Sequence, residues 1–196
     1  MSQVEVSSSG NTARVGGGAT VKKVVADLMA VGKQTGEQTP SAGIQGFLTD
    51  LGYIVTGICE SVGVSAPILG GGHGWLQGQY GLAADQIVSA RLVLPDGEVL
   101  TVSEDLNPDL FWALRGAGHN FGLVTEWEYR IYDIKNPKWS YEIFVFSGSK
   151  LEALYDLTNK MMKDQPPEVT HWGYIIKVAD IDPEHVSRAS IPPRRI

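Results

Sequence analysis

The spacing of apolar residues changes along the first 135 positions, and it predicts both helices and strands. Between residues 21 and 29, apolar side chains recur at intervals of three and four, which is typical of a helix with one buried face. Thr20 is suited to cap this helix, and Gly32 to end it. Residues 122–134 instead alternate as a half-buried strand does. The side chains expected on the buried face of that strand are Thr125, Trp127, Tyr129 and Ile131.

Local signals predict further strands and one short helix in this part of the chain. Residues 12–18 are expected to form a short strand that ends in glycines. Pro95-Asp96-Gly97 is a turn triplet, and it is expected to join strands at 86–94 and 98–103. A short helix is predicted over 107–116, with Asn107 as its cap. The aromatic residues assigned to the core here are Phe111, Trp112, Phe121 and Trp127.

The composition shifts after residue 136. We expect strands at 139–146 and 171–178, with an amphipathic helix over 150–162 between them. The polar stretch 180–196 is predicted to be an irregular tail. Strands and helices joined by hairpins favour the α+β class over a doubly wound parallel sheet.

An acidic balance and a shortage of cations narrow the range of partners. The 196-residue chain has a net charge of −6, and positions 34–90 contain no lysine or arginine. These features argue against a nucleic-acid or anionic-membrane surface. No apolar run reaches the ~20 residues of a membrane span. A single cysteine excludes an internal disulfide, and the four histidines lack the spacing of a metal site.

The most informative stretch is 57–85, which holds eight glycines and the only cysteine, Cys59. Glycine lets backbone N–H groups converge on an anion without side-chain interference. Because no cation lies nearby in sequence, the pattern suits the pyrophosphate of a permanently bound cofactor better than an exchanging triphosphate. The P-loop pattern is absent, and the G-x-G-x-x-G pattern is missed by one residue twice, which argues against a Rossmann site. The alternative is that these glycines only turn the chain.

Cys59 and two histidines are the other candidates for chemistry. A lone cysteine is more often an inert packing residue than a nucleophile, and both roles stay open for Cys59. His73 and His119 each lie inside a glycine cluster. Each is either held by loop backbone or in contact with a cofactor or substrate.

Five motifs in combination carry a resemblance to a known family. They are C-x-x-V-G at 59–63, GGG-x-G at 70–74, Y-G-L-A-A-D at 80–85, D-L-F-W-A-L-R-G at 109–116 and N-F-G-x-V-T at 120–125. The chain resembles the berberine-bridge-enzyme-like group of FAD-linked oxidoreductases. That group carries the FAD-binding domain shared with vanillyl-alcohol oxidase and para-cresol methylhydroxylase. The resemblance implies the second subdomain of such a domain, a mixed or antiparallel sheet with flanking helices, followed by the start of a sheet-plus-helix substrate domain.

The resemblance also implies the cofactor and the residues around it. Cys59 matches the position at which many members attach C6 of FAD through sulfur. The residues implied to line the pyrophosphate and the isoalloxazine are Val62, Gly63, Gly70, Gly71, Gly72 and Gly74. Those implied to lie near the cofactor are Ala83, Asp85, Gly122 and Val124. The implied reaction takes electrons from an alcohol or activated C–H of a small molecule and passes them to O2, and no catalytic residue is identified.

The departures from the family pattern lie at both ends and in one insert. The histidine-bearing first subdomain and the far half of the substrate domain have no counterpart, so the resemblance implies truncation at both ends. The expected parts are 1–135 for the partial FAD-binding domain, 136–180 for the substrate domain and 181–196 for the tail. Residues 36–55 form an atypical insert, for which a retained intron is one hypothesis. The alternatives to an active enzyme are an inactive remnant with little or no FAD binding, and a binding module for another phosphorylated ligand.

Overall fold

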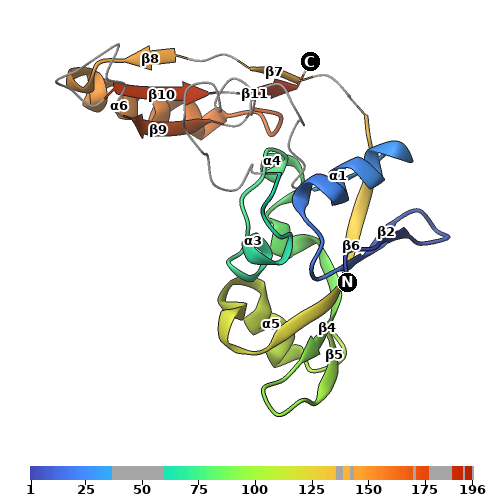
Figure 1. Ribbon diagram of the computed structural model, residues 1–196. Helices are drawn as coiled ribbons and strands as arrows, with labels where there is room; N and C mark the ends of the chain where they lie inside the picture. The colour runs from blue at the N-terminus through green and yellow to red at the C-terminus, as the bar shows by residue number, and fades with distance from the viewer. Residues whose placement is uncertain are drawn as a thin grey trace. The chain divides into compact units, whose positions relative to one another are not determined.

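The structure is a computed structural model, and its chain divides into two compact units, Met1–Lys135 and Asn136–Ile196, which are described separately (Figure 1). The α+β class predicted from the sequence is confirmed, because antiparallel sheets and flanking helices build both units. The residues that the structure describes are 1–36, 60–135, 139–141, 144–169, 171–176, 187–191 and 193–195.

A six-stranded antiparallel sheet forms the first unit, and its long strand β6 (Leu123–Asp133) lies at the centre. Strands β2 and β4 flank β6, and β1 and β5 lie outside them, while β3 also pairs with β6. The bounds of these strands are β1 Val4–Val6, β2 Thr12–Gly16, β3 Lys33–Thr35, β4 Ile87–Val93 and β5 Val99–Ser103.

In the described residues, four helices and two 3-10 turns accompany this sheet. Thr20 caps the first helix as predicted, because its hydroxyl accepts from the Lys23 amide at 3.4 Å. Asn107 lies at the cap position of α5 but does not cap it with its side chain, which donates instead to the Thr101 carbonyl at 2.9 Å. The bounds are α1 Val21–Ala30, α3 Ser65–Leu69, α4 Gln77–Tyr80, η1 Ala83–Gln86, α5 Pro108–Ala117 and η2 Gly118–Asn120.

The core lies on the inner face of β6, as the alternation predicts. Trp127 and Tyr129 are fully buried, and Val15 of β2 and Ala90 of β4 pair with Trp127 from either side. The assignment of Phe121 to the core is wrong, because its side chain is 39% exposed. The assignment of Trp112 is wrong too, because its side chain is 76% exposed. Its helix buries Phe111, and the next residue is rotated by about 100° around the helix axis, away from the core.

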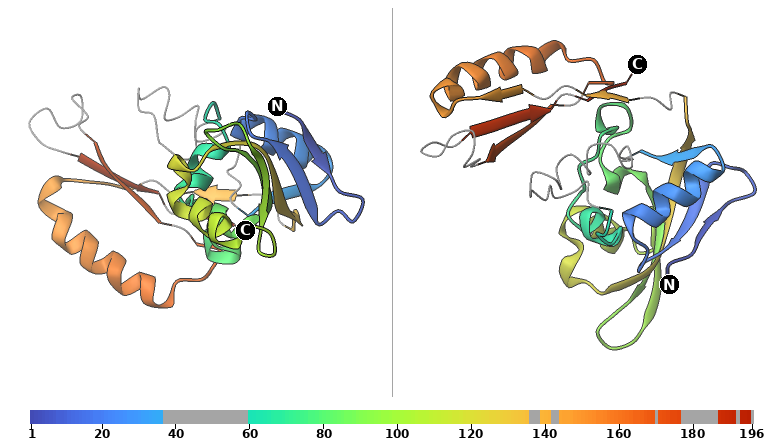
Figure 2. Two further views of the ribbon diagram at one scale, coloured as in Figure 1. Left: turned by 90° about the horizontal axis from the view of Figure 1, so that it is seen from below. Right: turned by 45° about the horizontal axis from the view of Figure 1, so that its top comes forward.

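The second unit contains helix α6 (Leu151–Met161) and short antiparallel strands, which can be followed by colour from orange to red in Figure 2. The irregular tail predicted for 181–196 is wrong where the structure describes it, since β10 pairs with β8 and β9, and β11 pairs with β7. Strand pairing uses backbone groups, so polar side chains do not prevent it. The strands are β7 Trp139–Tyr141, β8 Phe144–Phe146, β9 Trp172–Ile176, β10 Ser187–Ile191 and β11 Pro193–Arg195.

Candidate functional site

The glycine turn that follows α3 has a shape that other residues cannot adopt without strain. Gly71 and Gly72 have φ angles of 97° and 76°, in the left-handed region. A Cβ atom on Gly72 would lie 2.4 Å from the Cβ of Ala83. Both the backbone conformation and the close packing therefore require glycine at position 72.

The η1 turn holds the other side of this glycine turn. The amide of Ala83 donates to the Gly72 carbonyl, and the amide of Ala84 donates to the Gly71 carbonyl, each at 2.9 Å. Both alanines are buried, at 0% and 2% exposed. The turn is thus fixed from two sides, by α3 before it and by η1 beside it.

Three consecutive amides of the turn have no acceptor within the part of the chain that the structure describes. They belong to Gly72, His73 and Gly74, and both glycines are buried. Buried backbone N–H groups are almost always paired. Successive amides after left-handed residues form concavities that bind anions or other acceptors. The turn therefore suits an acceptor supplied from outside the described residues, such as a ligand.

A second glycine-rich loop, 116–122, lies against the first. A Cβ on Gly118 would approach the Leu69 side chain to 2.4 Å, and a Cβ on Gly70 would lie 3.8 Å from His119 Cε1. The sequence motifs around 70–74 and 116–122 therefore meet in space. Gly122 serves packing within the sheet, because a Cβ there would lie 2.5 Å from the Val93 carbonyl oxygen.

The segment that carries Val62 and Gly63 is joined to the start of α1. The Val21 amide donates to the Val62 carbonyl, and the Val64 amide donates to the Ala19 carbonyl, each at 2.9 Å. A Cβ on Gly63 would meet no described atom within 4 Å, so this backbone is open to a ligand.

Asp85 and Val124 act as supporting residues in the structure. The Asp85 carboxylate accepts from the Leu82 amide at 2.9 Å, which stabilises the turn into η1. Val124 is buried and pairs with Leu92 of β4. The predicted proximity of both residues to FAD stays a prediction.

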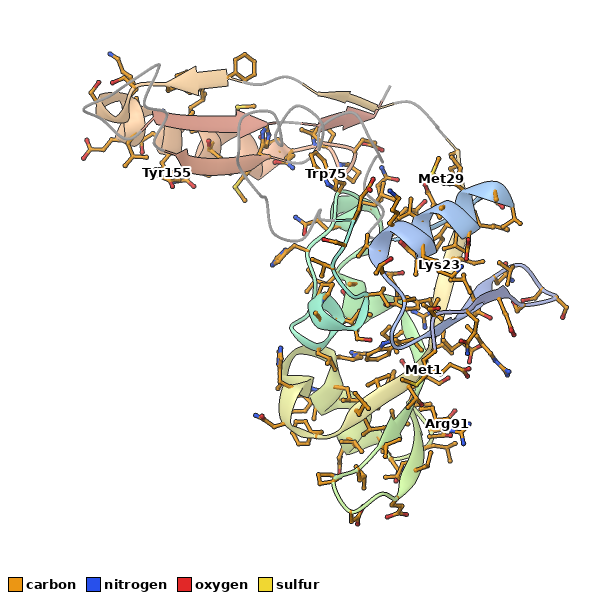
Figure 3. The ribbon with its side chains drawn as sticks, viewed as in Figure 1. Met1, Lys23, Met29, Trp75, Arg91 and Tyr155 are labelled. Atoms are coloured by element: carbon orange, nitrogen blue, oxygen red, sulfur yellow. The ribbon has the colours of Figure 1, made fainter. Side chains whose placement is uncertain are left out.

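Other predicted residues lie outside the described part of the chain or make contacts of another kind. Cys59 lies outside the described residues, as does nearly all of the segment 36–55, which was predicted to be an insert. His73 is exposed, and its Nδ1 lies 2.9 Å from Gln77 Oε1. Among the residues that can be described, no three histidine, cysteine, aspartate or glutamate side chains gather as metal ligands, and no helix is long and apolar enough to cross a membrane. Trp75, labelled in Figure 3, is buried directly after the glycine turn.

The sequence motifs did not point to a polar cluster behind η1. Gln86 is 2% exposed, and its side-chain amide donates to the carbonyls of Tyr80 and Leu82, at 2.5 Å and 3.2 Å. Its oxygen accepts from the Tyr132 hydroxyl at 2.7 Å, and the Tyr132 ring stacks on that of Tyr80 with centroids 4.1 Å apart. Burial raises the pKa of Tyr132, against the opposing effect of Arg130. The only sign of this cluster in the sequence is a glutamine immediately before an apolar strand.

Comparisons with known proteins show which proteins the chain is similar to. Residues 44–103 match the family model described as an FAD binding domain. The FAD-linked oxidoreductase chry5 of Gibberella zeae is 41% identical over 186 residues, which are 93% of this chain and 33% of that protein. The chain thus spans about a third of the length of this curated relative.

Two solved structures share the fold. Wild-type BBE-like 1 of Physcomitrella patens matches with a TM-score of 0.74 and 23% identity, over 97% of this chain and 36% of that one. Glucooligosaccharide oxidase of Acremonium strictum, described with a 6-S-cysteinyl, 8α-N1-histidyl FAD, matches with a TM-score of 0.68 and 24% identity, over 97% of this chain and 35% of that one. By sequence and by the match to an FAD-binding domain, the chain is related to the FAD-linked oxidoreductases, whose cofactor is FAD, and the two solved structures share its fold.

Proposed function

We propose that this chain contributes part of the FAD site of an oxidoreductase that oxidises an alcohol or activated C–H of a small molecule and passes the electrons to O2. The observation that carries the proposal is the glycine turn, in which the amides of Gly72, His73 and Gly74 have no acceptor in the described chain. The relationship to FAD-linked oxidoreductases supports the reaction class.

The residues of the turn would bind FAD through backbone dipoles. The amides of 72–74 would donate hydrogen bonds to its oxygen atoms, and Gly63 would let it approach the backbone closely. The segment 34–90 itself contains no lysine or arginine, so within this segment the amides would supply the positive end of these contacts. When bound, FAD would supply an acceptor for a hydride from the substrate, and the residues of the turn would orient it.

Cys59 is the proposed covalent attachment point. In the attachment reaction, the Cys59 sulfur would bond to C6 of FAD. The thiol hydrogen and the C6 hydrogen would leave as two protons and two electrons, and these would reduce O2 to H2O2. The 6-S-cysteinyl FAD described for the A. strictum enzyme supports this assignment.

The test is FAD uptake by the purified full chain. The expected result is saturable quenching of flavin fluorescence, together with yellow colour that stays in the pellet after acid precipitation. Cys59→Ser should release the colour into the acid supernatant while the native protein still binds FAD. A protein that stays colourless after incubation with FAD contradicts the proposal and supports the inactive remnant.

The electron acceptor needs its own measurement. Photoreduction of the bound flavin without oxygen, followed by admission of air, should restore the oxidised spectrum and release one H2O2 per flavin. Reoxidation only by an added dye would contradict the assignment of O2.

A further inference from the structure

The Gln86 side chain joins the central strand to the loop behind the glycine turn. Its oxygen accepts from Tyr132 of β6, and its nitrogen donates to the carbonyls of Tyr80 and Leu82. Tyr80 and Leu82 flank Gly81, whose φ angle is 85°. One buried amide thus holds the backbone on both sides of a flexible residue.

The same loop holds the glycine turn. Residue 82 directly precedes Ala83 and Ala84, whose amides donate to the carbonyls of Gly72 and Gly71. A continuous set of hydrogen bonds therefore runs from the Tyr132 hydroxyl through Gln86 and η1 to the turn. Strand β6 makes a second contact with this loop, because Arg130 donates to the Asp85 carbonyl at 3.3 Å.

This arrangement would act on FAD through the direction of the turn amides. The carbonyls of Gly71 and Gly72 share their peptide units with the amides of Gly72 and His73. A peptide unit is planar, so fixing its carbonyl also fixes the direction of its N–H group. Two of the three amides without an acceptor are thereby oriented by η1.

We infer that Tyr132 and Gln86 are positioning residues that orient the Gly72 and His73 amides toward FAD. This inference rests on the proposed function. Neither side chain needs to touch the cofactor, because each acts through the backbone of residues 80–84.

The direct test is FAD affinity in the Tyr132→Phe variant of the full chain. Phenylalanine keeps the ring stacked on Tyr80 but leaves the Gln86 oxygen without its donor. We expect the FAD dissociation constant to rise about 5- to 10-fold, close to the tenfold that 1.4 kcal/mol represents. Tyr80→Phe is the matched control, since the Tyr80 hydroxyl has no hydrogen bond to any described residue, and its affinity should stay within about twofold.

Hydrogen exchange of the protein without FAD gives a second readout. Tyr132→Phe should speed exchange of the Ala83 and Ala84 amides and leave that of Val24 in α1 unchanged. Gln86→Met, which removes both the donor and the acceptor, should reproduce both effects if Tyr132→Phe folds poorly.

The outcomes distinguish a failure of the proposed function from a failure of the positioning role. If the wild-type chain binds FAD and both Tyr132→Phe and Gln86→Met bind it with the same affinity, the positioning role alone is overturned. Absence of FAD binding by the wild-type chain overturns the proposed function and the positioning role with it, whatever the exchange data show. Reduced affinity in Tyr80→Phe equal to that in Tyr132→Phe also overturns the inference, because the loss would then not depend on the hydrogen bond between Tyr132 and Gln86.

Discussion

The indole N–H of Trp127 donates a hydrogen bond to the Ser65 hydroxyl at 2.8 Å, and that hydroxyl donates in turn to the Gly17 carbonyl at 2.8 Å. Three distant parts of the chain meet at this point: the centre of β6, the first residue of α3 and the loop after β2. Ser65 therefore both accepts and donates a hydrogen bond. It fixes the helix that leads into the glycine turn.

Ser65→Ala is expected to destabilise the first unit. The change leaves the buried Trp127 N–H without its acceptor, which costs about 1–3 kcal/mol in free energy of unfolding. Urea unfolding followed by tryptophan fluorescence measures the loss. Ser8→Ala, at an exposed turn, is the control and should stay within about 0.5 kcal/mol. Equal stability of Ser65→Ala and wild type would show that the bond contributes nothing.

Gly72→Ala is expected to cost more stability than Gly32→Ala. Both glycines have positive φ, 76° and 72°, but only at Gly72 does a new Cβ meet another atom, Ala83 Cβ at 2.4 Å. Gly32→Ala should cost about 1 kcal/mol from backbone strain alone, and Gly72→Ala about 2–4 kcal/mol in total. Denaturant unfolding of both variants measures the difference, and FAD uptake should fall only in Gly72→Ala.

Stability at alkaline pH should depend on Tyr132. Its pKa is raised by burial, so the folded state holds the phenolic proton more tightly than the unfolded state. The contribution of Tyr132 to the free energy of unfolding is complete below the ordinary tyrosine pKa of about 10, and it is lost as the pH rises through the raised pKa. Urea unfolding between pH 8 and pH 11 should show a steeper decline for wild type than for Tyr132→Phe. Parallel pH profiles would contradict this linkage.

The ion pair between Lys33 and Asp133 should matter little to stability. The nitrogen and oxygen are 2.6 Å apart, but the Asp133 side chain is 80% exposed. A hydrogen bond from Lys33 lowers the pKa of Asp133. The small contribution of this pair to the free energy of unfolding is therefore present above the ordinary carboxylate pKa, and it is lost as the pH falls through the lowered pKa. Asp133→Asn should leave the urea midpoint at pH 7 and 0.15 M salt unchanged. A clear drop there would show that this pair helps to hold β3 on β6.

Periodicity in the sequence predicted the elements whose signal is local. The alternation around Trp127 and the Thr20 cap both depend on residues a few positions apart, and both are confirmed. The exposure of Trp112 was missed because an aromatic residue next to a core position has no local mark of its orientation. The Asn107 side chain was misassigned because a carbonyl of the preceding strand competes with the helix for it.

The candidate site was predictable only in part. Glycine at 71 and 72 signalled an unusual turn, and the turn is present. The role of Gln86 could not be predicted, since its partner Tyr132 lies 46 positions away and neither residue belongs to a recognisable motif. The contact between the two glycine loops likewise depends on tertiary packing, which a single sequence does not record.

The central place of β6 has a consequence for synthesis on the ribosome. Strands β2 and β3 both pair with β6, and the Lys33–Asp133 contact joins residues 100 positions apart. Until β6 emerges, the edge of β2 that β6 covers in the described residues is open to wrong partners. We expect this delay to expose the nascent chain to aggregation until the sheet can close.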